Sequence, residues 1–465
     1  MSRNIVRIAG LIFAAFAVVI LYQTYIQVFQ GSQLLNHPRN RRLQLLEEAV
    51  TRGRIIDHSG RVLAESTGTG ENKKRIYPYK EITANITGYL SKRYGRWGLE
   101  SSYNEALLGL DSSSAGDDFW ALQRLDAGKR GDDIVLSLDT GLQQIAYRML
   151  GDRKGAVVAI EPSTGRVLAM VSRPGFNPEI IDADWDNLKE NTASPLLNRA
   201  TQGLYPPGST MKVVTAAGIL GIKPDAVNRS FDAPGYINIE GRRIEDKQAV
   251  GRLSFTEAFA RSSNYVFASL GIEQGAAVFT KTARSFGLGK GIPFDIPTED
   301  GNIPDPASLS KLELGESAIG QGRLTVTPLH MALIATAVAN GGKVMAPSLV
   351  DEIRGPGGSV ISHITPRLLW NAINTNTADI LRRLMVSAVA AGTGRGASIP
   401  GLQVAGKTGS AENPHGQPHA WFIGFAPADN PKVAVAVIIE NGGAGGKEAA
   451  PVAREIMKTV IGQKR

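Results

Sequence analysis

The first hydrophobic pattern along the chain is a long apolar segment close to its N-terminus. Residues 8–22 carry no charge, and the continuation to Phe29 adds only Gln23 and Gln27 as strongly polar positions. A helix over residues 8–29 would be about 33 Å long at about 1.5 Å per residue, close to the hydrocarbon thickness of about 30 Å of a bilayer. This segment is therefore predicted to be a transmembrane anchor.

The residues on either side of this segment predict its orientation. Arg3 and Arg7 precede it, so residues 1–7 are expected to form a cytoplasmic tail. A cleaved signal peptide has the same positive start but needs a small-residue cleavage site, whereas this segment ends in aromatic and glutamine residues. We therefore expect a single-pass protein of the cell membrane, with residues 30–465 outside the cytoplasm.

Residues 30–139 are charged and have an irregular pattern. Two short apolar runs, residues 54–57 and 61–64, flank the turn sequence His58-Ser59-Gly60 and predict two strands joined by a turn. The region holds no convincing catalytic cluster. A spacer or docking domain is the resulting expectation.

Residues 140–465 have a more regular pattern. Residues 142–150 have helical spacing, and residues 155–160 and 166–171 predict a hairpin. Further strands are expected near Val404 and over residues 421–423 and 432–439. Helices are expected over residues 211–220, 254–270, 276–286, 328–339 and 374–391. Strands at both ends with helices between them predict an α+β domain whose sheet is completed late in the chain.

The composition excludes several classes of protein. The 465 residues are 43 % hydrophobic and 20 % charged, as in ordinary globular proteins, and this length allows two to four domains. The absence of cysteine excludes a disulfide-stapled fold, a thiolate zinc site, an iron–sulfur cluster and a cysteine nucleophile. A net charge of +8 suits an anionic membrane surface or a polyanionic substrate as well as nucleic acid. The charge alone therefore identifies no partner.

Candidate chemistry begins with a serine and a lysine one helical turn apart. Ser209 follows two prolines and a glycine and precedes a helical run, so it is predicted at a helix N-terminus, where backbone N–H groups favour developing negative charge. Lys212 lies on the same face at i+3, and a desolvated lysine can take the proton of a serine hydroxyl. Taken alone, the pair is also explained by a helix cap and a solvated lysine.

Two further motifs strengthen the catalytic interpretation. In the segment Ser262-Ser263-Asn264, the hydroxyl of Ser262 and the carboxamide of Asn264 are separated by one residue, inside the helical pattern of residues 257–270. Lys407-Thr408-Gly409-Ser410 lies between strand candidates, where a glycine permits close approach of the backbone to a substrate and hydroxyls can bind a carboxylate. The order Ser-x-x-Lys, Ser-x-Asn, Lys-Thr-Gly is the motif set of the active-site-serine penicillin-recognising enzymes.

The chain as a whole resembles a class B high-molecular-mass penicillin-binding protein of the short PbpA type of actinobacteria. The matching segments are residues 52–57 with Gly60, 98–100 before Tyr103, 197–200, 318–322, 327–329, 392–394 and 419–422. Ser410 stands where many members have threonine, and no PASTA modules are expected. The resemblance implies a penicillin-binding, serine β-lactamase-like transpeptidase domain over residues 140–465. In this fold an antiparallel sheet is flanked by helices and stands on an anchored pedestal or dimerisation-like domain.

The resemblance also implies catalytic roles. Ser209 would be the acylated nucleophile and Lys212 its base. Ser262 together with Lys407 would relay the proton to the leaving amine.

Substrate-binding roles are implied in the same way. Asn264 would hold the substrate amide, while Thr408 and Ser410, with Gly409 between them, would bind the terminal carboxylate. The backbone N–H groups of Ser209 and Ser410 would form the oxyanion hole.

The implied activity is peptidoglycan D,D-transpeptidation. A donor stem peptide would lose its terminal D-Ala to form a serine acyl-enzyme, and an amine of a neighbouring stem would resolve it. β-Lactams would acylate the same serine, and slow deacylation is expected because the Glu-x-x-Leu-Asn segment of class A β-lactamases does not occur. The expected partners are stem peptides, β-lactams, the membrane, a cell-wall glycosyltransferase and division or elongation proteins. No cofactor, metal or nucleic acid is expected.

Two other functions stay open at this stage. One is a D,D-carboxypeptidase or β-lactamase of the same superfamily, although these enzymes are usually shorter and lack an anchored N-terminal domain of this kind. The other is a non-catalytic cell-wall scaffold or β-lactam sensor. The intact motif residues argue against a degenerate scaffold but do not exclude a sensor.

Two motifs point to unrelated chemistry. Residues 401–408 match the P-loop pattern, but the prolines that follow cannot form the helix that a P-loop opens, so no NTPase is expected. His415 and His419 are four residues apart, but no carboxylate lies between them as in His-Glu-x-x-His, and Pro418 argues against one helical face. Ordinary loop and strand histidines are therefore expected.

Overall fold

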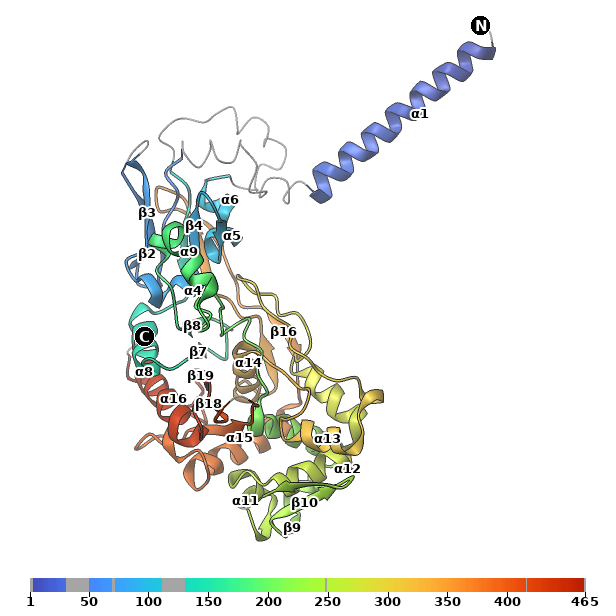
Figure 1. Cartoon of the computed structure of the whole chain (residues 1–465), viewed down its shortest axis with the longest axis vertical. Coiled ribbons are helices and arrows are strands. Elements are labelled where there is room, and N and C mark those ends of the chain that lie inside the picture. The colour runs from blue at the N-terminus through green and yellow to red at the C-terminus, as the bar shows by residue number, and fades with distance from the viewer. Residues whose placement is uncertain are drawn as a thin grey trace.

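The fold was analysed in a computed structural model of the chain. The structure describes residues 3–30, 50–68, 72–110, 130–246, 249–414 and 416–463. Its body is elongated, with a small pedestal at one end and a larger α+β domain beyond it (Figure 1).

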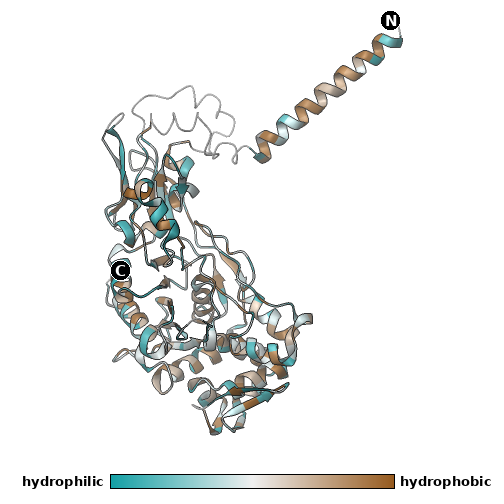
Figure 2. Ribbon diagram, viewed as in Figure 1, coloured by the Kyte–Doolittle hydropathy of each residue, from teal (hydrophilic) through white to brown (hydrophobic). Residues whose placement is uncertain are grey.

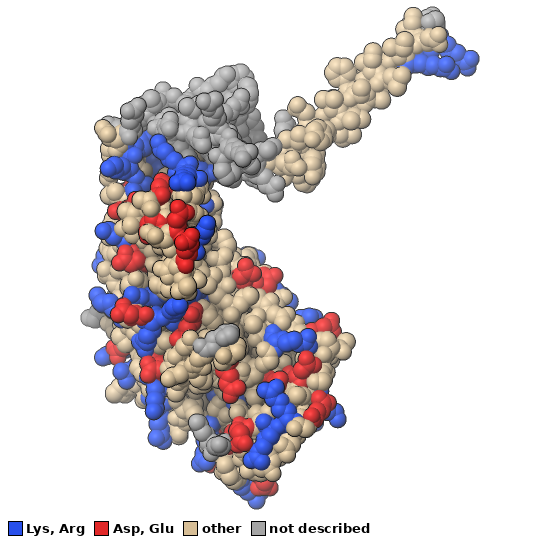
Figure 3. Space-filling view, in the orientation of Figure 1, with Lys and Arg blue, Asp and Glu red and all other residues tan. Residues whose placement is uncertain are grey.

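The N-terminal apolar segment forms a helix. α1 runs over Arg3–Tyr25 and continues as a π-helical turn over Ile26–Gln30. Its surface is hydrophobic along most of its length, and its cationic residues lie at its first turns (Figures 2 and 3). Among the residues that the structure describes, one helix is long and apolar enough to cross a membrane by length and composition. This helix is α1 with its π-helical continuation.

A five-stranded antiparallel sheet forms the centre of the larger domain (Figure 1). Its strand order is β17 (Ala405–Ala411), β18 (His419–Ala426), β19 (Val433–Ile439), β7 (Gly155–Ile160) and β8 (Val167–Arg173). β19 pairs with β7, so the last strand of the sheet joins the first across most of the domain. This confirms the predicted β7–β8 hairpin and the late completion of the sheet.

Helices bury both faces of this sheet. α8 (Thr140–Leu150) and α16 (Gly445–Gly462) cover one face and α14 (Pro328–Ala339) the other. Successive residues of β19 point to opposite faces and both sets are buried, which explains why this strand is apolar at every position. α14 starts where the sequence predicts, because Thr327 caps it in a capping box and proline occupies its first turn.

The larger domain contains further helices and small hairpins. The helices are α9 (Ile181–Glu190), α10 (Lys212–Ile222), α11 (Phe255–Ala260), α12 (Asn264–Ser285), α13 (Lys311–Ala318) and α15 (Thr375–Ala390). The paired strands are β9 (Ser230–Ala233) with β12 (Gly251–Ser254), β10 (Tyr236–Ile239) with β11 (Arg242–Glu245), and β13 (Lys343–Met345) with β16 (Leu368–Asn371). Of these elements, α15 packs against β17, α9 against the pedestal and β13 against α14.

Two local predictions were wrong in this region. The single helix expected over residues 254–270 is broken, because Ser262 has a positive φ of 63° and the Ser263 side chain caps the start of α12. The chain then stays helical beyond residue 270, with a kink at Gly275 that joins two predicted helices. The Lys-Thr-Gly motif does not lie between strands but inside β17.

The pedestal contains a six-stranded sheet. Its order is β15 (Val360–His363), β14 (Val350–Arg354), β6 (Asp133–Leu136), β1 (Ile55–Ile56), β2 (Val62–Thr67) and β3 (Lys74–Ile76). Short elements flank it, namely α4 (Ala84–Thr87), β4 (Tyr89–Ser91), β5 (Gly95–Trp97), α5 (Leu99–Ser102) and α6 (Asn104–Leu107). The β1–β2 hairpin confirms the predicted turn, whereas β14 and β15 come from far along the chain. The sheet thus contains strands from both sides of the domain boundary predicted between residues 139 and 140. The boundary itself stays a prediction.

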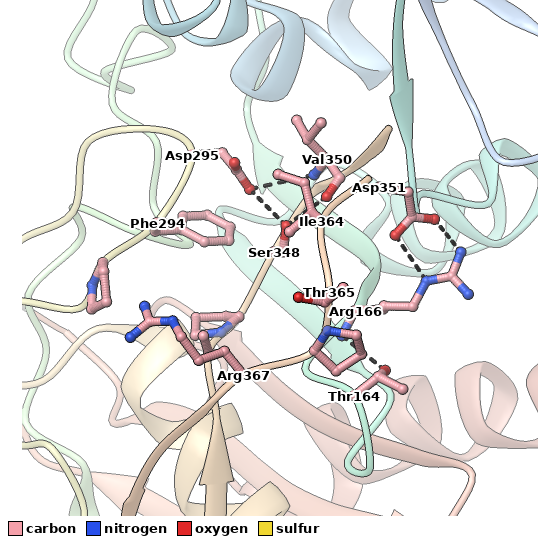
Figure 4. Close-up of a pocket in the computed structure, with 14 residues that line it drawn as sticks. Thr164, Arg166, Phe294, Asp295, Ser348, Val350, Asp351, Ile364, Thr365 and Arg367 are labelled. Atoms are coloured by element: carbon pink, nitrogen blue, oxygen red, sulfur yellow. Dashed lines mark hydrogen bonds and ion pairs between the residues drawn. The ribbon is translucent and has the colours of Figure 1, made fainter. Parts of the chain in front are cut away.

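Asp295 connects the pedestal with the larger domain. Its carboxylate accepts a hydrogen bond from the backbone N–H of Leu349 (2.6 Å), just before β14. It accepts another from the Ser348 hydroxyl (3.4 Å; Figure 4). It also accepts one from the hydroxyl of Tyr103 in the pedestal, and burial followed by the Asp295 charge raises the pKa of Tyr103. Beside it, Arg166 pairs with Asp351, and a pocket of about 200 Å³ lies between these groups.

We predict that Tyr103→Phe lowers the free energy of unfolding by about 1.5–3 kcal/mol, the usual value of a hydrogen bond to a charged group. Urea unfolding of the detergent-solubilised chain measures this. Tyr79→Phe is the matched control, because the Tyr79 hydroxyl makes no hydrogen bond within the described residues. Equal effects of the two substitutions would contradict the proposed role of the Tyr103 hydroxyl.

Candidate active site

One open cleft is lined by residues of all three motifs. It has a volume of about 790 Å³ and lies along the free edge of β17. Ser209, Ser262, Asn264, Thr408, Gly409 and Ser410 all line it. The structure therefore brings together residues that are up to 201 positions apart in the sequence.

Ser209 lies in a tight turn that opens a helix. A 3₁₀ turn over Gly208–Met211 runs directly into α10, and Gly208 has a positive φ of 54°. The indole N–H of Trp421 in β18 donates to the carbonyl of Pro206 (3.0 Å), which fixes the turn to the central sheet. This confirms that Ser209 lies at a helix N-terminus, with the backbone N–H groups of the first turn nearby.

Gly409 is required by the approach of β17 to this turn. A Cβ atom on Gly409 would lie 3.0 Å from the carbonyl oxygen of Pro207 and 3.2 Å from the backbone nitrogen of Thr210. Any larger side chain would push the strand away from the serine. The absence of a side chain therefore sets the width of the cleft beside Ser209.

Lys212 is fully buried and contacts the second motif. Its Nζ donates to the carbonyl oxygen of Ser262 (2.6 Å), to Asn264 Oδ1 (2.8 Å) and to Ser262 Oγ (3.2 Å). Lys212 donates no hydrogen bond to Ser209, and the Ser209 hydroxyl makes none with any described residue. Ser262 has a left-handed backbone, with a φ of 63°, and its carbonyl oxygen accepts the shortest of the three hydrogen bonds from the lysine.

Lys407 is buried on the other side of the Ser262 hydroxyl group. Its Nζ donates to Ser262 Oγ (2.9 Å) and to the carbonyl oxygen of Thr408 (3.0 Å), and its side chain exposes no surface. Ser262 Oγ thus lies within hydrogen-bonding distance of two lysine nitrogens. One proton can be exchanged among these three groups without large movement.

Burial shifts the proton affinity of both lysines. Desolvation lowers the pKa of Lys212 to about 7, and the charge of Asp246 opposes part of this shift. Burial also lowers the pKa of Lys407 well below its ordinary value, and the neighbouring charge of Lys212 lowers it further. Near neutral pH a substantial fraction of Lys212 can therefore be a neutral amine, which is the form that accepts a proton.

Asp246 is a residue that the sequence analysis missed. It is buried beside β11, and its carboxylate accepts hydrogen bonds from Ser263 Oγ (2.6 Å) and the backbone N–H of Tyr265 (2.9 Å). It thereby anchors the start of α12 and keeps a negative charge near Lys212. No motif surrounds this aspartate in the sequence, so only the fold could reveal it.

The hydroxyl groups of β17 have defined neighbours. Thr408 Oγ1 lies 2.6 Å from Thr393 Oγ1, and the backbone N–H of Gly445 donates to Ser410 Oγ (3.4 Å).

The strand conformation of the Lys-Thr-Gly motif excludes the P-loop interpretation, in which the lysine and threonine open a helix. His415 lies outside the described residues, and His419 Nδ1 accepts the backbone N–H of Asn441. Within the described ranges, no group of three metal-ligating side chains occurs.

The arrangement is suited to acyl transfer through a serine ester. A serine at a helix start faces an open cleft, a strand edge runs beside it, and two buried amines share one relay hydroxyl. The fold and the site together define the class of penicillin-recognising active-site-serine enzymes.

Comparison with known proteins identifies the family within this class. The family model of the penicillin-binding protein transpeptidase domain matches residues 155–458, and that of the penicillin-binding protein A dimerisation domain matches residues 52–132. The chain belongs to the class B penicillin-binding protein transpeptidases.

Individual relatives of the PbpA type support this assignment. The peptidoglycan D,D-transpeptidase PbpA of Mycobacterium tuberculosis is 37 % identical over 99 % of both chains, and that of Mycolicibacterium smegmatis is 36 % identical over the same shares. The ceftriaxone acyl-enzyme complex of M. tuberculosis penicillin-binding protein A has a TM-score of 0.82 at 36 % identity, covering 90 % of this chain and 100 % of that one. The family and the fold expected from the motifs are thereby confirmed.

The buried amine predicts a pH-dependent stability. Between about pH 7 and the ordinary lysine pKa of 10.5, Lys212 is neutral in the folded chain and protonated in the unfolded chain. The unfolded state then binds more protons, so stability rises with pH. We predict that the stability of the wild type relative to Lys212→Met rises by up to about 1.4 kcal/mol per pH unit in this range.

Urea unfolding of the detergent-solubilised chain at pH 7.5, 8.5 and 9.5 would measure this difference. Lys458→Met, at an exposed lysine of α16, is the matched control. A stability difference that does not change with pH would contradict the burial of a neutral amine at residue 212.

Proposed function

We propose that this chain is a peptidoglycan D,D-transpeptidase that cross-links stem peptides through an acyl-enzyme on Ser209. The observation that carries the proposal is the meeting of two buried lysines on Ser262 Oγ, beside a free serine hydroxyl in an open cleft. The M. tuberculosis relative of similar length is a peptidoglycan D,D-transpeptidase, and its structural counterpart forms acyl-enzymes with β-lactams.

In the first half-reaction Ser209 Oγ attacks the carbonyl carbon between the last two D-Ala residues of the donor. Lys212, as a neutral amine, takes the hydroxyl proton. The negative charge on the carbonyl oxygen is stabilised by the backbone N–H groups of Ser209 and Ser410. Removal of one such donor typically costs about 2.7–4 kcal/mol of barrier.

The tetrahedral intermediate then expels D-Ala. The C–N bond breaks, and a proton must reach the departing nitrogen. Ser262 Oγ can donate that proton and be resupplied from Lys212 or Lys407, since both nitrogens lie within 3.2 Å of it. Ser262 and Lys407 are therefore assigned to the proton relay.

An extended donor peptide fits the free edge of β17. This edge offers unpaired backbone groups to which an added strand can bond, as in other cases of strand addition. Thr408 and Ser410 would bind the terminal carboxylate. Asn264 would hold the substrate amide through its side-chain nitrogen, which donates one N–H to the Glu245 carbonyl (3.0 Å) and has a second N–H to offer.

The anchor determines where this reaction takes place. Residues 1–7 are assigned to the cytoplasmic side and residues 8–29 to the membrane, because cationic residues precede the apolar helix. We assign residues 30–139 to the pedestal and residues 140–465 to the catalytic domain outside the cytoplasm, with β14 and β15 of the second range completing the pedestal sheet. A cell-wall glycosyltransferase and division or elongation proteins are the proposed partners there, since cross-linking needs newly made glycan strands.

A labelled penicillin tests the function directly. We predict one stable adduct per chain in intact-mass measurements, located on Ser209 by peptide mapping and lost in Ser209→Ala. Ser101→Ala, at an exposed serine of the pedestal, is the control and should be acylated like the wild type. Rapid release of the adduct would indicate a β-lactamase instead, and stable adducts without cross-linked or hydrolysed stem peptides would indicate a sensor.

A further inference from the structure

One ion pair of the larger domain lies outside the cleft and takes no part in the proposed proton transfers. Arg199 Nε donates to Glu440 Oε1 (2.7 Å), and only 3 % of the Arg199 side chain is exposed. Glu440 directly follows β19 and does not line the cleft. It can therefore act on the reaction only through other residues.

The same carboxylate oxygen binds the segment that precedes the nucleophile. The hydroxyl of Tyr205 donates to Glu440 Oε1 (2.7 Å). Burial, followed by the charge of Glu440, raises the pKa of Tyr205, so this hydroxyl keeps its proton and acts as a donor. Three residues separate Tyr205 from Ser209. Glu440 is thus one hydrogen bond away from the turn that carries the attacking oxygen.

Arg199 fixes the place of this carboxylate. Its two other guanidinium nitrogens donate to the carbonyl oxygens of Ser194 (3.0 Å) and Ala193 (2.7 Å). Its backbone N–H donates to the hydroxyl of Ser172 (2.9 Å), which belongs to β8 of the central sheet. Every nitrogen of the guanidinium thus has a partner, which restricts the side chain to one orientation.

Two prolines make the serine turn dependent on side-chain contacts. Pro206 and Pro207 have no backbone N–H, so the main chain between Tyr205 and Gly208 has no donor of its own. The indole N–H of Trp421 donates to the Pro206 carbonyl (3.0 Å), and the Tyr205 ring packs edge-on against the Trp421 ring, with centroids 6.1 Å apart. A shift of Tyr205 would therefore also disturb the indole that holds the turn.

We infer that Glu440 is a positioning residue for the nucleophile, because one carboxylate oxygen holds Arg199 and Tyr205 together and thereby fixes the turn that carries Ser209. A neutral side chain at residue 440 leaves the buried guanidinium without its counter-charge, so both contacts are disturbed. A displacement of the attacking oxygen by about 1 Å can cost about a hundredfold in rate. The inference rests on the proposed function and adds a residue that acts from outside the cleft.

The split between binding and acylation tests the inference. The detergent-solubilised full chain is mixed with increasing concentrations of a labelled penicillin, which gives the dissociation constant of the non-covalent complex and the first-order rate constant of acylation at saturation. Unfolded chains reduce the amount of adduct but do not change this rate constant. We expect Glu440→Gln to lower the rate constant about 10- to 100-fold and to change the dissociation constant less than about twofold.

Tyr205→Phe tests whether the two residues act through one contact. It removes only the hydroxyl that Glu440 binds, so we expect slower acylation with the same split between the two constants. The double variant Glu440→Gln/Tyr205→Phe should then be slower than Glu440→Gln by less than about twofold. Glu273→Gln is the matched control with the wild-type rate constant expected, because Glu273 also binds two cationic partners, Lys223 and Arg229, but not the turn.

A wild-type rate constant in Glu440→Gln, or a loss that lies in the dissociation constant, would overturn the inference and leave the proposed function intact. Effects of the two substitutions that multiply in the double variant would overturn it as well. If Glu440→Gln does not fold, a wild-type rate constant in Tyr205→Phe contradicts the inference on its own. Failure of the wild type to be acylated on Ser209 would overturn both proposals.

Discussion

Two buried lysine side chains meet on the hydroxyl group of one serine. Lys212 and Lys407 lie on either side of Ser262 Oγ, and neither nitrogen has a carboxylate within salt-bridge distance in the described part of the chain. Removing two like charges from water at such close range is costly, so the pair holds fewer protons than two solvated lysines would. The low proton occupancy of the pair is the physical basis of the proposed catalysis, because it leaves a neutral amine that can act as a base. The described residues that line the cleft include no histidine or cysteine that could take this role.

The rest of the domain can be understood as the support for this pair. The central sheet holds Lys407 in β17, and the helix that follows the Ser209 turn holds Lys212 beneath the same cleft. Gly409 lets the strand approach the turn, and Asp246 fixes the start of α12, which follows the relay serine Ser262. Each of these features has a local cost, such as the left-handed backbone of Ser262, and the packed core around them supplies the stability that maintains it.

Local signals in the sequence were sufficient for several elements but not for their long-range contacts. α14 and the β7–β8 hairpin were predicted because a capping threonine, a proline and alternating apolar residues act over a few positions. The break before α12 was not predicted, because the sequence does not show which of several serines in an apolar helical pattern will cap a helix. The joining of β14 to the pedestal and the place of Asp246 depend on contacts between distant segments, and no local pattern encodes these.

The central claim is that a neutral Lys212 activates Ser209 for acylation. The most direct measurement is the second-order rate constant for acylation by a labelled penicillin between pH 5 and pH 9. With the pKa of Lys212 near 7, the rate should fall about tenfold per pH unit well below pH 7 and level off above it. A rate constant that stays level from pH 5 to pH 9, or one that Lys212→Met leaves unchanged, would contradict the account.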